Sequence, residues 1–316
     1  MCKYNVAAYI TAYQDIEALN KCIISLKNQT YPIKEIFIID NSPEKLIFST
    51  LGEQGLILEH HPNNIGISGG LEIAVKWSIE NNYDFLWTFD QDSQPSSDNL
   101  EKLLLYYDNL NCDDNLIGVI APLSIDIQSQ QELEGAIWGK YQFVPASIYK
   151  NRDLRGFYKK EFYDCDIVIT SGSLVNLKIA QNVKLPNRDL FIDSVDWDYC
   201  MNFREKGFRV VVVTQAVMYH NFGNYLKDHL LSSKQIPIYN YSALRYFYTC
   251  RNHTYIESRL AYKDKSLWLS ITFRLKALFK KIIKIILYEN DNKIIKIGAC
   301  IQGTFDGFIG RLGKTW

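Results

Sequence analysis

The chain has 316 residues, of which 47% are hydrophobic and 22% are charged, so it is long enough to bury the core of one large or two small domains. Its 35 basic residues balance its 35 acidic residues, which argues against a general nucleic-acid binder. Its seven cysteines include no Cys-x-x-Cys pair, and this argues for reduced thiols over a disulfide framework or a zinc site. There is no run of about 18 apolar residues, as a membrane-spanning helix would need.

Apolar strands alternate with amphipathic helices along the chain. Strands are predicted over 5–11, 35–40, 56–60 and 83–89, and helices over 15–29, 66–81 and 97–110. Further on, strands are predicted over 117–121, 166–170, 208–214 and 217–220, and a helix over 195–206. This order is typical of an α/β fold with a mixed, mainly parallel sheet between helices. Ligands of such sheets bind at the carboxyl ends of the strands, where this chain has Thr11, Asp40 and Asp90.

An acidic pair, Asp90 and Asp92, follows the fourth predicted strand. Two carboxylates separated by one residue can share Mg²⁺ or Mn²⁺, and such a cation also binds diphosphate oxygens and neutralises a leaving nucleoside diphosphate. The alternative is a solvated turn, which Asp favours. His220 lies at the end of the last apolar strand and is a candidate third ligand, although a lone His is usually a capping or surface residue.

Asp40 ends the second predicted strand, and a glycine-rich loop, Asn63–Gly70, precedes a predicted helix. The Asp40 carboxylate can accept a hydrogen bond from a uracil or thymine base, or it can cap a turn. The glycines allow close approach of the backbone, and the helix start offers free N–H groups. The loop matches neither the dinucleotide-binding nor the Walker A pattern, which argues against an NAD-dependent enzyme and an ATPase.

Three acids, Asp193, Asp196 and Asp198, border the start of the helix predicted over 195–206. Acidic residues at a helix start complement its dipole. One carboxylate there can also act as a general base, because an acceptor hydroxyl must lose its proton as it attacks a sugar.

Several segments, taken in order, resemble glycosyltransferase family 2. They are AYITAYQD, LKNQTYPIKEIFIIDNS, NNIGISGGLEIAVKWS, FLWTFDQDSQP, TSGSLV, LFIDSVDWDYCMNFREKGF and FYTCRNHTYI, and they span residues 5 to 256. Within the family, they are most similar to the bacterial rhamnosyltransferases of surface-polysaccharide synthesis. The resemblance implies a GT-A fold.

The resemblance also implies roles for individual residues. Asp90 and Asp92 match the motif that binds the metal and the diphosphate, and Asp196 matches the catalytic base of a Glu-Asp pair. Val195 replaces the Glu of that pair, so Asp193 stays an alternative base. The nucleotide-binding loops are matched by Thr11, Tyr13, Asp15, Asp40, Asn64 and Gly70. The acceptor or donor-sugar side and the rim of the active site are matched by Trp197, Asp198, Arg251 and Asn252.

The implied activity is a metal-dependent, inverting sugar transfer. Asp196 deprotonates the acceptor hydroxyl, the cation stabilises the departing diphosphate, and no covalent enzyme intermediate forms. dTDP-L-rhamnose is the expected donor, with UDP-Gal or UDP-Glc as the alternative. The expected acceptor is a glycan or lipid-linked sugar of an O-antigen or capsule. An inactive scaffold of a polysaccharide assembly complex is the alternative from another class, against which Asp90, Asp92 and Asp196 together argue.

The chain is predicted to divide into a catalytic domain, residues 1–225, and a helical segment, residues 226–316. A basic amphipathic helix is predicted at about 264–288, with Arg274, Lys280, Lys281 and Lys284 opposite its apolar face. Such a helix is typical of an interfacial membrane anchor, with a packing helix or a homodimer contact as alternatives. Because a strand begins near the N-terminus, no signal peptide is expected, and the predicted location is cytoplasmic, on the inner face of the cell membrane.

Overall fold

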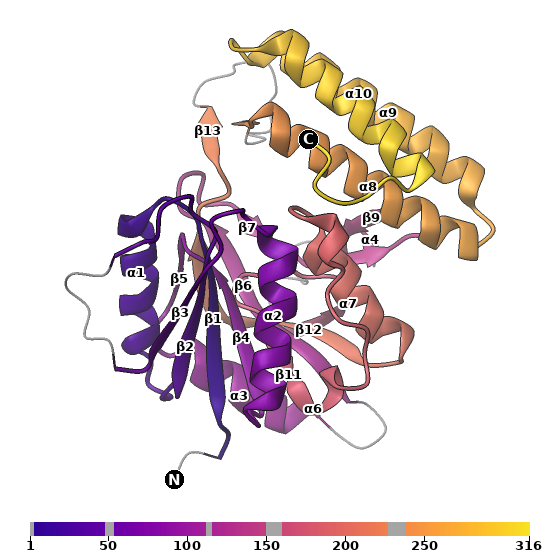
Figure 1. Cartoon of the computed structure of the whole chain (residues 1–316). Helices are drawn as coiled ribbons and strands as arrows, with labels where there is room; N and C mark the ends of the chain where they lie inside the picture. The colour runs from indigo at the N-terminus through magenta and orange to yellow at the C-terminus, as the bar shows by residue number, and fades with distance from the viewer. Residues whose placement is uncertain (1–2, 48–53, 112–115, 150–159, 227–237) are drawn as a thin grey trace.

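The computed structural model describes residues 3–47, 54–111, 116–149, 160–226 and 238–316. A central sheet crosses the molecule (Figure 1). Its strands are β1 (Val6–Ala12), β2 (Glu35–Asp40), β3 (Leu56–His60), β4 (Phe85–Asp90), β5 (Ser93–Pro95), β6 (Ile117–Asp126), β7 (Glu132–Leu133), β10 (Phe162–Cys165), β11 (Leu174–Asn176) and β12 (Arg209–His220). They follow the order β10-β12-β6-β11-β4-β1-β2-β3, with β5 on β12 and β7 on β6. Two hairpins lie outside the sheet: β8 (Ala136–Trp138) with β9 (Phe143–Pro145), and β13 (Asn224–Leu226) with β14 (Ile238–Asn240).

The sheet is mixed and mainly parallel in its centre, as the sequence predicts. β1 runs parallel to β2 and β4, β2 runs parallel to β3, and β12 runs parallel to β6, whereas β11 is antiparallel to both of its neighbours. In this register Thr11 lies opposite Asp90, and the next residue of β1, Ala12, lies opposite Asp40. The three polar strand ends therefore share one edge of the sheet.

Helices cover both faces of the sheet (Figure 1). They are α1 (Ile16–Lys27), α2 (Gly66–Glu80), α3 (Asn99–Leu110), α4 (Ala146–Tyr149), α6 (Leu177–Ala180), the short 3₁₀ helix η1 (Arg188–Leu190), α7 (Val195–Glu205), α8 (Ala243–Lys263), α9 (Leu267–Tyr288) and α10 (Lys293–Ile309). Alternate residues of β1 belong to different cores: Ala7 and Tyr9 pack with α2 and α7, whereas Ala8 and Ile10 pack with α1 and α3. This period of two is what a strand buried on both faces requires.

Three predicted strands differ from the structure. The strand predicted over 166–170 is wrong, because pairing with β12 ends at Cys165 and Ile167 forms only an isolated bridge to Ala136. The strands predicted over 208–214 and 217–220 form one strand, β12, with an irregularity between Val213 and Val217. Local hydrophobicity predicts each of these three segments as a separate strand, but the hydrogen-bonding partner decides where a strand ends.

The helices α8, α9 and α10 pack on one another above the sheet (Figure 1). Two glycines bring α10 against α8: a Cβ on Gly303 would lie 2.3 Å from the Phe247 carbonyl oxygen, and one on Gly307 would lie 2.4 Å from that of Arg251. The backbones of the two helices are therefore in direct contact. Within the described residues, no helix has the length and hydropathy needed to cross a membrane.

The helix predicted at about 264–288 is α9, and three of the four basic side chains named for it have partners in the protein. Arg274 pairs with the buried Glu257 at 2.5 Å, Lys281 lies over the Tyr246 ring, and Lys284 donates to the Tyr239 carbonyl oxygen. Carboxylate and aromatic partners beneath α9 attract these side chains away from water. Large apolar side chains of α9 are exposed instead: Trp268, Leu269, Leu275, Phe279, Ile283, Ile286 and Leu287.

Candidate active site

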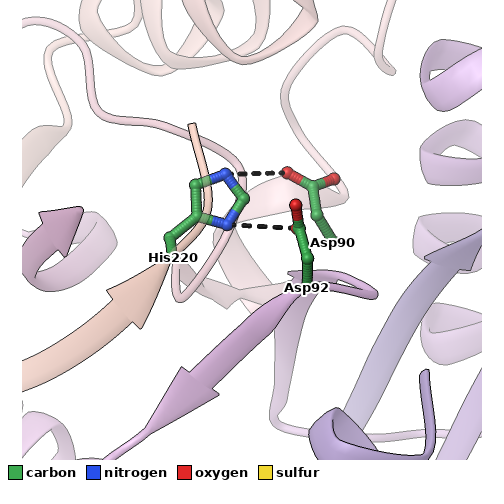
Figure 2. Close-up of side chains that lie close together, drawn as sticks. All are labelled: Asp90, Asp92 and His220. Carbon is green, nitrogen blue, oxygen red and sulfur yellow. Dashed lines mark ion pairs between the residues drawn. The ribbon is translucent and has the colours of Figure 1, made fainter. Parts of the chain in front are cut away.

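Asp90, Asp92 and His220 meet at the carboxyl edge of the sheet, as Figure 2 shows. Asp90 is the last residue of β4, and the chain turns directly into β5, which pairs antiparallel with β12. In that pairing Ser93 lies opposite His220. A strand more than a hundred residues later in the sequence thus places the imidazole beside the acidic pair.

The geometry of this cluster fits a divalent cation. His220 Nδ1 lies 3.3 Å from Asp92 Oδ1, and Nε2 lies 3.9 Å from Asp90 Oδ2. One candidate ligand atom from each residue lies within 4.8 Å of the others. Among the described residues, Asp90 Oδ1 is buried and has no hydrogen-bond partner, which is unusual for a carboxylate unless an ion satisfies it.

Burial shifts the proton affinities of all three side chains in this cluster. Burial raises the pKa of Asp90 and raises that of Asp92 to about 6, because a desolvated carboxylate disfavours its charged form. Burial lowers the pKa of His220, which favours the neutral ring with a lone pair for a metal. Ser93 Oγ lies 2.8 Å from Nδ1, which leaves Nε2 as the candidate ligand atom.

The predicted base lies beside this cluster. Asp196 stands in the first turn of α7 and accepts hydrogen bonds from the backbone N–H groups of Thr170 (3.2 Å) and Trp197 (3.0 Å). The next residue, Ser171, accepts from the backbone N–H of Asp90 through its Oγ at 3.0 Å. Consecutive residues of one loop therefore contact the predicted base and the predicted metal ligand.

Asp196 has the proton affinity of a general base. Burial, followed by the negative charge of Asp193, raises its pKa to about 7, although the hydrogen bonds from Trp197 and Thr170 act in the opposite direction. A base with a pKa near the working pH is efficient, because it is both ionised and sufficiently basic.

Asp193, the alternative base, is held by α8. Thr249 Oγ1 lies 2.6 Å from its Oδ2, and His253 Nε2 lies 3.7 Å from its Oδ1. Burial opposes ionisation of Asp193, but the contacts with His253 and the charge of Arg245 outweigh it and hold the pKa well below its usual value. A carboxylate so stabilised is a weak base, so the structure favours Asp196 over Asp193.

The loop before α7 has a strained backbone. Phe191, Asp193 and Ser194 have φ angles of 64°, 71° and 58°, a left-handed region that side chains with a Cβ rarely adopt. Asn252 of α8 stabilises the loop, because its Nδ2 lies 3.0, 2.8 and 2.8 Å from the carbonyl oxygens of residues 190, 192 and 193. The strained conformation of this loop is therefore stabilised by α8, a helix about 60 residues further along the chain.

Arg251, predicted to line the sugar side, lies under the same loop. It is fully buried, and its guanidinium donates to the carbonyl oxygens of Asp189, Leu190 and Gly313. Carbonyl oxygens take these donors and the side chain supports the loop, so a sugar contact of Arg251 stays a prediction. The segment after α10 thus folds back onto the catalytic domain.

The residues predicted to bind the nucleotide share the edge of the sheet, but several already have protein partners. Thr11 is buried beside Asp90, and Tyr13 is exposed, with its backbone hydrogen-bonded to the Gln91 side chain. Asp15 caps α1 by accepting from the Ala18 N–H. Asp40 is fully buried and accepts from the N–H groups of Ser42 and Leu46. The structure therefore has the turn alternative at Asp40, and a base-reading role stays a prediction.

The glycine-rich loop is fixed by close contacts. Asn64 has a φ of 47° and accepts from the Gly66 N–H, and Asn41 Oδ1 accepts from the Ile65 N–H. A Cβ on Gly70 would lie 2.4 Å from the Tyr9 hydroxyl. Gly70 therefore lets α2 pack on β1, and its nucleotide contact stays a prediction.

Trp197 and Asp198 point in different directions from α7. The Trp197 ring stacks on His253 at 4.2 Å, close to Asp193. Asp198 lines a groove between α7 and α8 together with Met201 and Ile256. Residues two apart on a helix face different sides, so Asp196 and Asp198 do not share a site, and the predicted sugar contact of Asp198 has no support here.

Sequence reasoning missed the residues that position the site. Ser93, Ser171 and Asn41 contact the metal cluster and the glycine-rich loop through side chains that have no distinctive pattern of their own. Ser171 stands in the segment TSGSLV and Asn41 follows Asp40 directly, so their places beside predicted site residues were the available signal.

Comparisons with known proteins agree with this geometry. A family model described as "Glycosyl transferase family 2" matches residues 8–170. The chain is 25% identical to "dTDP-rhamnosyl transferase RfbF" of Shigella flexneri, over 98% of this chain and 97% of that protein.

Solved structures share the fold. S. aureus TarS 1–349 in complex with UDP-GlcNAc aligns with a TM-score of 0.54 and 13% identity, over 95% of this chain and 81% of that chain. GalNAc-T7 with UDP, GalNAc and Mn²⁺ aligns with a TM-score of 0.52 and 12% identity, over 69% of this chain but only 44% of that longer chain. At these identities the likeness concerns the fold alone.

Proposed function

The chain belongs to glycosyl transferase family 2, and on that premise we propose that it transfers a sugar from a nucleoside diphosphate to an acceptor hydroxyl with inversion. One observation carries this proposal: Thr170 binds Asp196, and its neighbour Ser171 binds Asp90. These two hydrogen bonds connect a candidate proton acceptor and a candidate cation site through consecutive residues of one loop, which supports a direct displacement.

The reaction needs a group that accepts the proton of the hydroxyl and a cation that stabilises the negative charge of the leaving diphosphate. Asp196 takes the proton of the acceptor hydroxyl while its oxygen forms the new bond to the anomeric carbon. The bond from that carbon to the diphosphate breaks on the opposite face, and its electron pair stays with the leaving phosphate oxygen. Asp90, Asp92 and His220 would hold a divalent cation, Mg²⁺ or Mn²⁺, that neutralises this oxygen.

Variants of Asp196 test the mechanism. Asp196→Asn removes the proton acceptor but keeps one of the two oxygens that accept from the backbone N–H groups of Thr170 and Trp197. We expect turnover to fall by about 10²–10⁴-fold, the usual contribution of a general base, while binding of the nucleoside diphosphate is unchanged. Asp198→Asn is the matched control on the same helix. Unchanged turnover by Asp196→Asn would refute the assignment of the base.

We propose dTDP-L-rhamnose as the donor, because the relative from Shigella flexneri carries that specificity in its name and matches nearly the whole chain. A UDP-hexose is the second candidate, since UDP-GlcNAc is the ligand of one structure with the same fold. Thermal unfolding with dTDP or UDP, each with Mn²⁺, compares the two bases. A ligand at 100 times its dissociation constant stabilises by about 2.7 kcal/mol. Sugar transfer from UDP-hexose but not from dTDP-rhamnose would reject the first donor.

The proposed acceptor is a glycan or lipid-linked sugar at the inner face of the cell membrane, and α9 is the proposed contact with lipid. Trp268, Leu275, Phe279 and Ile286 recur at 7, 4 and 7 residues and share one exposed face. Lys276 and Lys280 are exposed next to it. An apolar face with adjacent cations is suited to the surface of an anionic bilayer.

Vesicle sedimentation tests this contact. We expect the protein to bind vesicles containing phosphatidylglycerol, and the double variant Leu275→Glu, Phe279→Glu to lose this binding. The control is Leu105→Glu, at an exposed leucine of α3 in the catalytic domain. Unchanged vesicle binding by the double variant would reject the lipid contact. If the wild type and the Leu105→Glu control form a dimer and the double variant does not, this face of α9 contacts a second copy of the chain.

A further inference from the structure

Arg245 lies at the start of α8, facing the loop that carries the catalytic carboxylates. Ser242 caps α8 by accepting from the Arg245 N–H at 3.2 Å. The guanidinium lies 4.5 Å above the Tyr241 ring, and its Nε lies 4.0 Å from Asp193 Oδ2. The side chain is 44% exposed, so it can change partners without breaking the core.

A short series of contacts connects Arg245 with the candidate metal site. The Phe222 ring packs edge-on against His220 at 4.7 Å, and the Tyr241 hydroxyl donates to the Phe222 carbonyl oxygen at 3.4 Å. A Cβ on Gly223 would lie 3.8 Å from Arg245 Nη1. Arg245 thus lies between the loop of Asp193 and the segment that follows the metal-binding histidine.

The positive charge of Arg245 faces carboxylates of both the metal cluster and the loop before α7. Its Nε lies 4.0 Å from Asp193 Oδ2, and its charge also acts on Asp90 and Asp92. Asp90, Asp92, Asp193 and Asp196 together can carry four negative charges, which a single divalent cation does not balance. A diphosphate that binds beside these carboxylates therefore needs a further cation.

We propose that Arg245 is a catalytic residue that binds the diphosphate of the donor and stabilises the charge on the departing nucleoside diphosphate. The planar guanidinium offers paired N–H donors to two phosphate oxygens. On binding, it exchanges its contact with Asp193 for phosphate oxygens, and it donates hydrogen bonds without transferring a proton. This role rests on the proposed function, because it names a further residue for the same displacement.

A matched pair of variants tests the role. Arg245 lies over Tyr241, and Arg259 of the same helix lies over Tyr255 at 5.1 Å, also four residues earlier. Both side chains are outside the core, so Arg245→Gln and Arg259→Gln lose the same charge and the same type of aromatic contact. Arg245→Lys keeps the charge but loses the paired donors. Circular dichroism checks that each variant folds.

Calorimetry with Mn²⁺ compares a nucleoside diphosphate with the corresponding monophosphate. For Arg245→Gln we expect diphosphate binding to weaken by about tenfold or more, as for the loss of a hydrogen bond to a charged group, and monophosphate binding to change by less than about threefold. We also expect kcat to fall more than KM rises, because the negative charge grows during bond cleavage. Arg245→Lys should be intermediate, and Arg259→Gln should match the wild type.

Three results would overturn the role: equal losses for both nucleotides, wild-type diphosphate affinity in Arg245→Gln, or an equal loss in Arg259→Gln. If Arg245→Gln shifts the pH profile but keeps the diphosphate affinity, Arg245 acts only through its contact with Asp193. If the wild type transfers no sugar from any donor, the proposed function fails. The diphosphate comparison stands apart from that result, since it measures binding only.

Discussion

Replacement of Asn252 by Ala should loosen the catalytic loop from a distance. Asn252 is fully buried, and its Nδ2 group is the donor to three carbonyl oxygens of residues 190–193. An amide Nδ2 has two hydrogens, so two bonds are lost, and a third is lost where Oδ1 accepts from Arg251 Nε at 2.8 Å. At about 1 kcal/mol for each bond, we expect about 3 kcal/mol less stability.

Urea unfolding followed by tryptophan fluorescence measures this loss, and steady-state kinetics measures its effect on turnover. We expect kcat to fall by about 10²-fold, as for a small misplacement of a catalytic group. Asn252→Asp should be less stable still, because its carboxylate would face the same carbonyl oxygens. The control is Asn81→Ala, at an exposed amide that donates to the Trp77 carbonyl oxygen.

The reasoning fails if Asn252→Ala costs no more stability than Asn81→Ala, or if Asn252→Asp matches the wild type. A stable Asn252→Ala enzyme with normal kcat would mean that the strained loop holds its shape without α8.

Three further predictions follow from the site and the helical packing. The kcat/KM of the wild type should rise with pH through about 7, because Asp196 must be ionised. Asp193→Asn should move this rise to lower pH, because it removes a neighbouring negative charge. pH–rate profiles measure both, and an unmoved rise contradicts the effect of Asp193 on the pKa of Asp196. His220→Ala should need a higher Mn²⁺ concentration for half-maximal turnover, measured by metal titration; an unchanged requirement excludes His220 as a ligand. Gly303→Val should unfold at a lower temperature than Gly298→Val. A Cβ at Gly303 would lie 2.3 Å from the Phe247 carbonyl oxygen, whereas a Cβ at Gly298 would have no described atom within 4 Å. Calorimetry measures both melting temperatures, and equal values contradict the close packing of α10 on α8.

Local sequence patterns predicted the elements that position the metal cluster. The alternation of apolar runs gave β1, β2, β3 and β4 nearly to their observed ends. Since the carboxyl ends of parallel strands meet at one edge, the predicted place of Asp90 and Asp92 followed from the fold class alone. His220 could be proposed as a neighbour only because a buried strand precedes it.

Contacts between distant segments could not be predicted in this way. The sequence gives no sign that Arg251 donates to carbonyl oxygens about 60 residues earlier, or that Arg274 pairs with a buried glutamate. Both residues look like solvated cations, because their partners are backbone atoms or side chains of another helix. The role of Asp40 was ambiguous because its carboxylate can accept a hydrogen bond either from a backbone N–H of a turn or from the N–H of a nucleotide base.

The attachment of the 189–193 segment to α8 makes the carboxyl-terminal helices necessary for the chemistry at the sheet edge. Its hydrogen bonds join residues separated by 59 to 62 positions, so this segment is held from α8 and not by its neighbours in the sequence. A chain shortened before α8 would keep the acidic pair but lose the donors that fix the backbone just before Asp196. The two predicted parts of the chain therefore act as one catalytic unit.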